Sequence, residues 1–215
     1  SQPCVAGVNH LITSAVALDK NTEEINFGNS VALTDEFAIV GANGPGKAFL
    51  FSNDDGTTPA FALDKNTGGN FGFSVALTNR WAIVGAISSN RVFVFKNDGG
   101  TSWGTTAEVA LDDGFMSVSG FGTNVALTNE WALVGANNQK RAFLFKNNGG
   151  EWQAKPRFYL QSPTNAGYSV ALTNQWAFVG AYATKKVYLF KKNLGQDLWG
   201  KETETWGSVM STSQY

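Results

Sequence analysis

A positively charged residue ends a short polar turn in each of four similar segments of this 215-residue chain. The turns read NGPGK, ISSNR, NNQKR and YATKK, and their last residues recur at intervals of 44, 50 and 45 residues. Two of the turns carry a lysine directly before their last residue, and two further lysines follow matching Leu-Asp pairs. The candidate ligand-binding cations are Lys47, Arg91, Lys140, Arg141, Lys185, Lys186, Lys20 and Lys65. Gathered on one surface, they could bind a sulfated or carboxylated polymer through many weak contacts; solubilising charge at hairpin ends is the alternative.

A second recurring position holds an aromatic residue, which is Phe37, Trp81, Trp131 or Trp176 in successive copies. Tryptophan can stack on sugar rings, so the three tryptophans are candidates for a glycan surface. Packing between repeats is the alternative, because core positions that fit the same neighbour recur in every copy. Three more tryptophans follow glycine-rich turns and are expected to cap that edge; they are Trp103, Trp152 and Trp199.

Catalytic and metal-binding constellations are sparse. His10 is the single histidine and Cys4 the single cysteine, too few for a Cys/His metal site and a poor basis for a nucleophile-base pair. The carboxylate pairs Glu23–Glu24 and Asp112–Asp113 are typical of solvated loops. We therefore expect no enzyme activity, and we note that Cys4 could form a disulfide to another chain.

Calcium is the one cofactor that the sequence raises. Asp19, Asn21 and Glu23 place oxygen-bearing side chains at alternate positions of DKNTEE, as a hard cation requires. The matching DKNTGG lacks both glutamates, and one such loop offers too few ligands for six- or seven-fold coordination. We expect a polar turn here and no cofactor.

Composition limits the other function classes. The chain is 43% hydrophobic, enough for one globular core, but it has no run of about 20 apolar residues that could span a membrane. Its formal net charge of −1 gives no general attraction to nucleic acid.

The cations and aromatics are spaced by a repeated pattern of short strands. Each copy contains a segment such as SVALT, a two-residue turn, WAIVGA, a polar turn and RVFVFK, all β-branched or aromatic and bounded by Asn, Asp or Gly. We name these strands A, B and C; the A strands are expected near 30–34, 74–78, 124–128 and 169–173. Glycine-rich turns then lead to a strand D at residues 60–64, 107–112 and 157–161. The polar turns that end in a cation are therefore B–C turns.

Four-stranded units at such intervals predict an all-β β-propeller with four blades. Residues 15–28 match those from Ala60, so the chain begins with a D strand, and we expect residues 11–18 to complete the last blade and close the ring. Residues 1–10 form an N-terminal segment, residues 11–200 the propeller domain, and residues 201–215 a tail or a competing outer strand.

The order NFGFSVALTNRWAIVGA…RVFVFKNDGG, with Phe-Gly before strand A and Val-Gly-Ala ending strand B, resembles the FG-GAP repeat of integrin α-subunit-like β-propellers. The resemblance covers about residues 11–200. It implies that a ligand binds on the face formed by the B–C turns and D–A loops. Two departures are the four copies, where the family usually has seven blades, and the tight A–B turn where its calcium-binding members carry an acidic loop.

These observations favour a secreted, extracellular recognition or adhesion module, lectin-like in binding a glycan or a protein through the B–C/D–A face. The alternative is a structural subunit of a larger extracellular assembly without a soluble ligand, in which two chains could share a larger ring. A hydrolase remains a third class, because propellers also carry enzymes.

Overall fold

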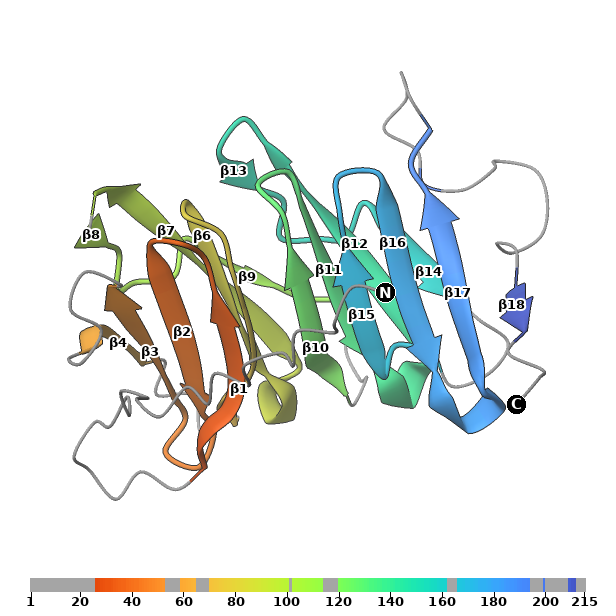
Figure 1. Ribbon diagram of the computed structural model, residues 1–215, viewed down its shortest axis with the longest axis horizontal. Coiled ribbons are helices and arrows are strands. Elements are labelled where there is room, and N and C mark those ends of the chain that lie inside the picture. Colours follow the sequence, from red (N-terminus) through yellow and green to blue (C-terminus); the bar gives the residue numbers. More distant parts are fainter. Residues whose placement is uncertain are drawn as a thin grey trace, which may run out of the picture.

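The computed structural model describes residues 26–52, 59–64, 70–100, 102–113, 120–161, 166–193, 199 and 209–211. These residues form four antiparallel sheets, and Figure 1 shows the sheets side by side in a row, in chain order. Each sheet runs A, B, C from its inner to its outer edge, with short outer strands beyond C. The expected all-β architecture of repeated blades is confirmed.

The strand bounds follow the repeats. Blade 1 contains β1 (Phe27–Leu33), β2 (Phe37–Ala42), β3 (Lys47–Ser52) and β4 (Pro59–Asp64). Blade 2 contains β5 (Phe71–Leu77), β6 (Trp81–Ala86), β7 (Arg91–Gly99), β8 (Ser102–Trp103) and β9 (Val109–Leu111). Blade 3 contains β10 (Phe121–Leu127), β11 (Trp131–Ala136), β12 (Arg141–Asn148), β13 (Glu151–Trp152) and β14 (Phe158–Gln161). Blade 4 contains β15 (Ser169–Leu172), β16 (Trp176–Ala181), β17 (Lys186–Lys191) and β18 (Val209–Ser211).

The outer strand of blade 4 comes from the C-terminal segment. β18 pairs with β17 along Lys186 to Tyr188, which is the edge that the sequence pattern assigns to residues 11–18. Residues 11–18 lie outside the described part of the chain. Of the two alternatives for residues 201–215, the pairing of β18 corresponds to the outer strand.

The A strands of blades 1 to 3 begin earlier than expected because each starts with a bulge, whereas that of blade 4 begins at Ser169 as expected. In blade 2, Phe71 lies opposite Ala86, and the register then shifts before Ser74. The intervening Gly72 has a φ of +88°, a region that glycine enters without a Cβ clash. The Phe-Gly pair is thus part of the strand, and blades 1 and 3 repeat the arrangement.

The threonine that ends each A strand closes the A–B turn. Thr78 Oγ1 accepts hydrogen bonds from the backbone N–H groups of Arg80 and Trp81, at 3.3 and 3.0 Å. The Thr78 N–H donates to the Trp81 carbonyl at 2.8 Å. Threonine hydroxyls commonly organise turns in this way. The equivalent residues Thr34, Thr128 and Thr173 make the same contacts.

A buried asparagine joins the A–B turn to the C–D hairpin in blades 2 and 3. In blade 3, Asn147 Nδ2 donates to the Asn129 carbonyl at 3.0 Å, and Asn147 Oδ1 accepts from the Gly150 N–H at 2.8 Å. Asn97 makes the equivalent bonds in blade 2. One side chain therefore holds two loops from different hairpins together.

Replacing this asparagine is expected to weaken the fold measurably. Asn147→Ala removes both bonds and leaves a carbonyl and an N–H group unpaired, so we expect a loss of about 2 kcal/mol in the free energy of unfolding. Denaturant titration would measure it, with Asn148→Ala at the exposed neighbouring position as the control. If Asn147→Ala and Asn148→Ala were equally stable, Asn147 would not be holding the two loops together.

The hydrophobic core lies between blades. We call the side of a blade that meets the preceding blade its front face, and the side that meets the following blade its back face. Three clusters each join the back face of one blade to the front face of the next: blades 1 and 2, 2 and 3, and 3 and 4. A fourth cluster, around Val40 and Phe49, belongs to the front face of blade 1 alone.

Candidate functional site

The B–C turn cations occupy one equivalent position in all four blades. Lys47, Arg91, Arg141 and Lys186 each begin strand C, opposite the last alanine of strand B. Three of the turns contain a short 3-10 helix, η1 (Ile87–Ser89), η2 (Asn137–Gln139) and η3 (Tyr182–Thr184), and Figure 1 shows these helices along the lower edge of the row. Lys140 and Lys185 end η2 and η3 in the left-handed conformation. The structure thus brings the six candidate cations that lie within the described residues to the same end of the blades.

Their side chains differ in environment. Arg91 and Lys186 are exposed, whereas Lys47 and Arg141 are half-buried, and the Arg141 guanidinium lies 5.4 Å from the centroid of the Tyr159 ring. The backbone carbonyls of Lys47, Arg91 and Arg141 also pack closely against a glycine of the next blade, which is Gly72, Gly122 or Gly167. Blade packing therefore accounts for part of the recurrence of this position.

The remaining sequence candidates in this group fall outside the described residues. They are Lys20, Lys65, the calcium candidates Asp19, Asn21 and Glu23, and the potential catalytic or cross-linking residues Cys4 and His10.

The recurring tryptophans pack between blades. Trp81 and Trp131 are fully buried, and Trp176, on the back face of blade 4, is half-buried. Trp81 meets Trp152 edge-on with ring centroids 5.8 Å apart, and Trp131 meets Trp199 in the same way at 5.5 Å. Because their ring faces are covered by the neighbouring blade, Trp81 and Trp131 offer no surface to a sugar, and the packing alternative fits them.

A basic pocket lies at the other end of blade 3. It has a volume of about 600 Å³ and is lined by the β12–β13 hairpin and the segment that leads to β14: Lys146, Asn148, Gln153, Ala154, Lys155, Pro156 and Arg157. Lys146 lies opposite Trp131, the first residue after the A–B turn, so the pocket is remote from the B–C turn of its own blade. Volumes of about 300–1,000 Å³ are typical of small-molecule sites.

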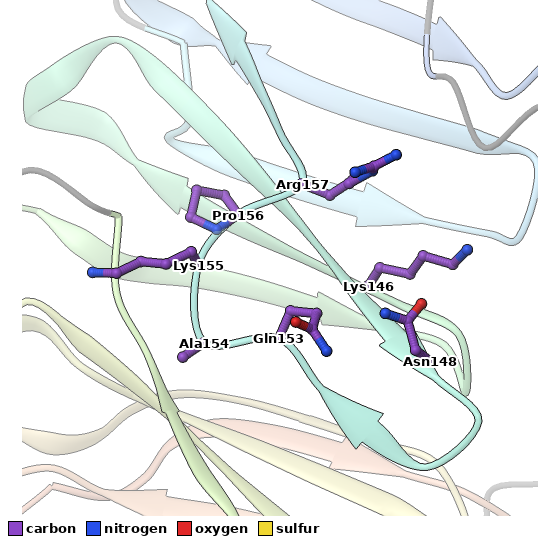
Figure 2. Close-up of a pocket in the computed structure, with 7 residues that line it drawn as sticks. All are labelled: Lys146, Asn148, Gln153, Ala154, Lys155, Pro156 and Arg157. Atoms are coloured by element: carbon purple, nitrogen blue, oxygen red, sulfur yellow. The ribbon is translucent and has the colours of Figure 1, made fainter.

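Two of the three cations point the same way. Figure 2 shows Lys146 and Arg157 extending in one direction, while Lys155 extends in the other. Lys155 forms an ion pair with Asp112 of blade 2. Lys146 and Arg157 are therefore the two cations that lie together at one side of the pocket.

An aromatic ring lies close to each of these two cations. The Lys146 ammonium lies 5.8 Å from the Trp131 ring centroid, and the Arg157 guanidinium lies 5.6 Å from that of Phe158. Lys192, which pairs with Glu130 at 3.7 Å, lies 5.2 Å from the same Trp131 ring. Cation–π contacts hold charged groups in place while leaving their hydrogen-bond donors directed outward. The buried tryptophan thus contributes to a charged surface that it does not itself reach.

Blade 2 carries the opposite charge pattern at the equivalent place. Arg157 donates its backbone N–H to Leu144 as Glu108 does to Val94, so Glu108 corresponds to Arg157, and Asp98 corresponds to Asn148. Lys96 corresponds to Lys146 but pairs with Asp98 at 3.6 Å. Where blade 2 has carboxylates, blade 3 has an amide and an arginine.

Within the described ranges there is no group of three or more His, Cys, Asp or Glu side chains that could hold a metal ion. The pair Asp112–Asp113 is engaged with other groups: Asp112 pairs with Lys155, and Asp113 accepts a hydrogen bond from Gln139 at 2.6 Å. No helix in the described part of the chain is long and apolar enough to cross a membrane.

Comparison with known proteins identifies the fold through solved structures. The β-propeller domain of Cps50 (Swd1) from Myceliophteria thermophila superposes with a TM-score of 0.57 at 14% identity, over 76% of this chain and 53% of that one. The fold is a β-propeller. A functionally unknown protein from Desulfotomaculum acetoxidans matches with a TM-score of 0.65 at 14% identity, over 85% and 55% of the two chains. The periplasmic gluconolactonase of Pseudomonas aeruginosa matches with a TM-score of 0.60 at 13% identity, over 81% and 53%.

This chain thus spans about half the length of each of these three propellers. No protein-family model matches it, and no curated protein matches it. The β-propeller that the FG-GAP resemblance implies is confirmed, while membership of that family stays a prediction. One of the three similar structures is named as an enzyme, so the fold alone does not decide between catalysis and binding.

Proposed function

We propose that this propeller is a non-catalytic recognition module that binds an acidic glycan, carboxylated or sulfated, at the basic pocket of blade 3. The proposal rests on one observation: Lys146 and Arg157 extend in one direction at the pocket of blade 3, and the residues of blade 2 that correspond to Arg157 and Asn148 are the carboxylates Glu108 and Asp98. An arginine presents a planar pair of donors to a carboxylate or sulfate, and a neighbouring ammonium adds charge. The amides of Asn148 and Gln153 can bind hydroxyl groups beside the acid.

A polymeric ligand suits the rest of the surface. The cations of the B–C turns lie at the other end of the blades and could add weak contacts along a long chain, as the sequence pattern suggests. In this proposal they are secondary, because Arg141 is stacked on Tyr159 and the turn backbone packs against the next blade. The extracellular location expected from the sequence belongs to the same proposal.

A charge reversal at the pocket tests it. Arg157→Glu installs the residue type that blade 2 carries at this position, so the fold should tolerate the change. We expect its affinity for heparin and for polygalacturonate at low salt to fall about 10-fold, or about 1.4 kcal/mol. Microcalorimetry or salt elution from a heparin column would measure the fall.

The matched control is Arg91→Glu, the same change of charge on an exposed B–C turn residue. It should alter affinity less than twofold. A large effect of Arg91→Glu with none of Arg157→Glu would place binding on the B–C turns instead. Unchanged or absent binding in both variants would remove the acidic-glycan function and favour the structural alternative.

A further inference from the structure

The two ends of the row of blades expose apolar side chains. On the front face of blade 1, Val31 and Leu33 are 66% and 76% exposed. On the back face of blade 4, Phe178 and Val187 are 40% and 42% exposed. Figure 1 shows blades 1 and 4 at opposite ends of the row, so these two faces do not meet within it.

The same positions are buried or half-buried wherever two blades meet. Half-buried are Leu77, Leu127 and Leu172, which correspond to Leu33, and Val125 and Val170, which correspond to Val31. Ile39, Ile83 and Leu133, which correspond to Phe178, are fully buried on back faces, as are Ala48, Val92 and Ala142, which correspond to Val187. Val75, which corresponds to Val31, is buried in the cluster between blades 1 and 2. The front face of blade 1 and the back face of blade 4 are therefore the two halves of a junction that the chain already forms three times.

The glycines of blades 1 and 4 that correspond to those at the internal junctions lack the contacts with a neighbouring blade. At each internal junction, the glycine that follows Phe71, Phe121 or Ala166 lies against the backbone of the preceding blade, so that a Cβ on Gly72, Gly122 or Gly167 would meet the carbonyl of Lys47, Arg91 or Arg141. Gly28 has the same φ of +87°, yet nothing lies within 4 Å of the position of its Cβ. The counterpart of those carbonyls in blade 4 belongs to Lys186.

The last glycine of strand B gives the reciprocal observation. A Cβ on Gly41, Gly85 or Gly135 would overlap the carbonyl oxygen of Gly72, Gly122 or Gly167 in the following blade. At Gly180 in blade 4 the three atoms nearest to such a Cβ all belong to Ser169 of the same blade. Gly180 is thus shaped to receive a backbone that no described residue supplies.

Polar groups complete the junction. The Val75 N–H of blade 2 donates to Ser30 Oγ of blade 1 at 3.0 Å, and Ser74 Oγ of blade 2 donates to the Gly122 carbonyl of blade 3 at 2.8 Å. In blade 4 the corresponding serine is Ser169, which is exposed. It is placed to bond Val31 N–H or the Gly28 carbonyl of an incoming blade 1.

We infer that a second copy of this chain supplies that blade. The front face of blade 1 of each copy packs on the back face of blade 4 of the other, and two identical junctions close a ring of eight blades about a twofold axis. The inference is independent of the glycan-binding proposal, since blade 3 lies within one copy.

The first test is the mass of the chain in solution. Light scattering coupled to size exclusion, in reductant so that Cys4 cannot cross-link chains, should give twice the mass of one chain at micromolar concentration. Leu33→Glu and Phe178→Lys each bury a charge in both junctions, so each should weaken self-association at least 100-fold and give a single-chain mass. Tyr159→Glu, on the outer strand β14 of blade 3, is the matched control and should stay dimeric.

Mixing the two monomeric variants provides the sharper result. Leu33→Glu keeps an intact back face and Phe178→Lys keeps an intact front face, so a mixed dimer has one native junction and one in which the new glutamate meets the new lysine. We expect the mixture to return to twice the chain mass. A single-chain mass for the unaltered protein, or failure of the mixture to associate, would overturn the inference.

A substitution that adds no charge tests whether the expected loss of self-association is a general effect of surface charge. Ser169→Ala/Gly180→Ala adds a methyl group that an isolated chain accommodates, since the three atoms nearest to it belong to Ser169, but that would overlap Gly28 of a second copy. It should be folded by circular dichroism and monomeric by mass, whereas Ser169→Ala alone should remain a dimer. A dimer that survives the double substitution would contradict the proposed junction.

Discussion

Gly135→Ala is expected to lower the free energy of unfolding by about 3 kcal/mol or more. A methyl group on Gly135 would overlap the carbonyl oxygen of Gly167, which belongs to the backbone of blade 4 and cannot rotate aside as a side chain can. The carbonyl of Gly167 sits there because Gly167 itself, at a φ of +90°, packs against the carbonyl of Arg141. This overlap would be relieved only if blades 3 and 4 moved apart, which would also loosen the hydrophobic cluster that joins them.

Gly104→Ala is the control for this prediction. A Cβ at Gly104 would meet its nearest neighbour, the Lys96 carbonyl, at 3.5 Å, which is ordinary van der Waals contact. Its stability should equal that of the unaltered chain or rise by a few tenths of a kcal/mol, because alanine restricts the unfolded chain. Denaturant titrations of both variants would decide the matter, and a loss below about 1 kcal/mol for Gly135→Ala would show that the junction adapts.

Trp131→Ala is expected to destabilise the chain by about 3–5 kcal/mol. The indole is fully buried between blades 3 and 4, meets Trp199 edge-on, and lies beneath Lys146 and Lys192. Its removal would leave a cavity and remove the support of two cations. Thermal and denaturant unfolding would measure the effect.

A conservative variant separates packing from ligand contact. Trp131→Phe keeps an aromatic ring in the cluster, and the Trp131 Nε1 has no hydrogen-bond partner in the structure, so this variant should lose only about 1–2 kcal/mol. It should bind heparin nearly as the unaltered chain does, since the pocket cations remain. A folded Trp131→Phe that has lost all heparin binding would show that the indole itself contacts the ligand.

Much of the fold can be predicted from the sequence because the same pattern of strands and turns occurs in four copies. Segments such as WAIVGA and RVFVFK are strands in every blade, and the threonine of VALT closes the A–B turn through its own hydroxyl. The start of each A strand was less predictable. A Phe-Gly pair is typical of a turn, and only the bulge places Phe71 opposite Ala86 within the strand.

The candidate site was harder to predict because its residues lie on β12 and on the segment before β14, which are adjacent only after the hairpin folds. Lys146 and Arg157 are eleven positions apart, and Arg157 does not recur, whereas the B–C turn cations recur in all four copies. The available signal was a difference between copies. Aligning the C–D segments of blades 2 and 3 sets Glu108 against Arg157 and Asp98 against Asn148, and such a reversal of charge within a repeat indicates a position released from packing.

The three shared clusters also have an evolutionary consequence. Since every junction joins one back face to one front face through the same glycines and apolar positions, a duplication of one whole repeat would insert a blade that already fits both neighbours. A deletion or insertion out of step with the repeat would instead set a back face against the wrong surface. Selection on such a chain can therefore change its length in whole blades while each B–C turn and each C–D hairpin varies on its own, as the basic pocket of blade 3 has done.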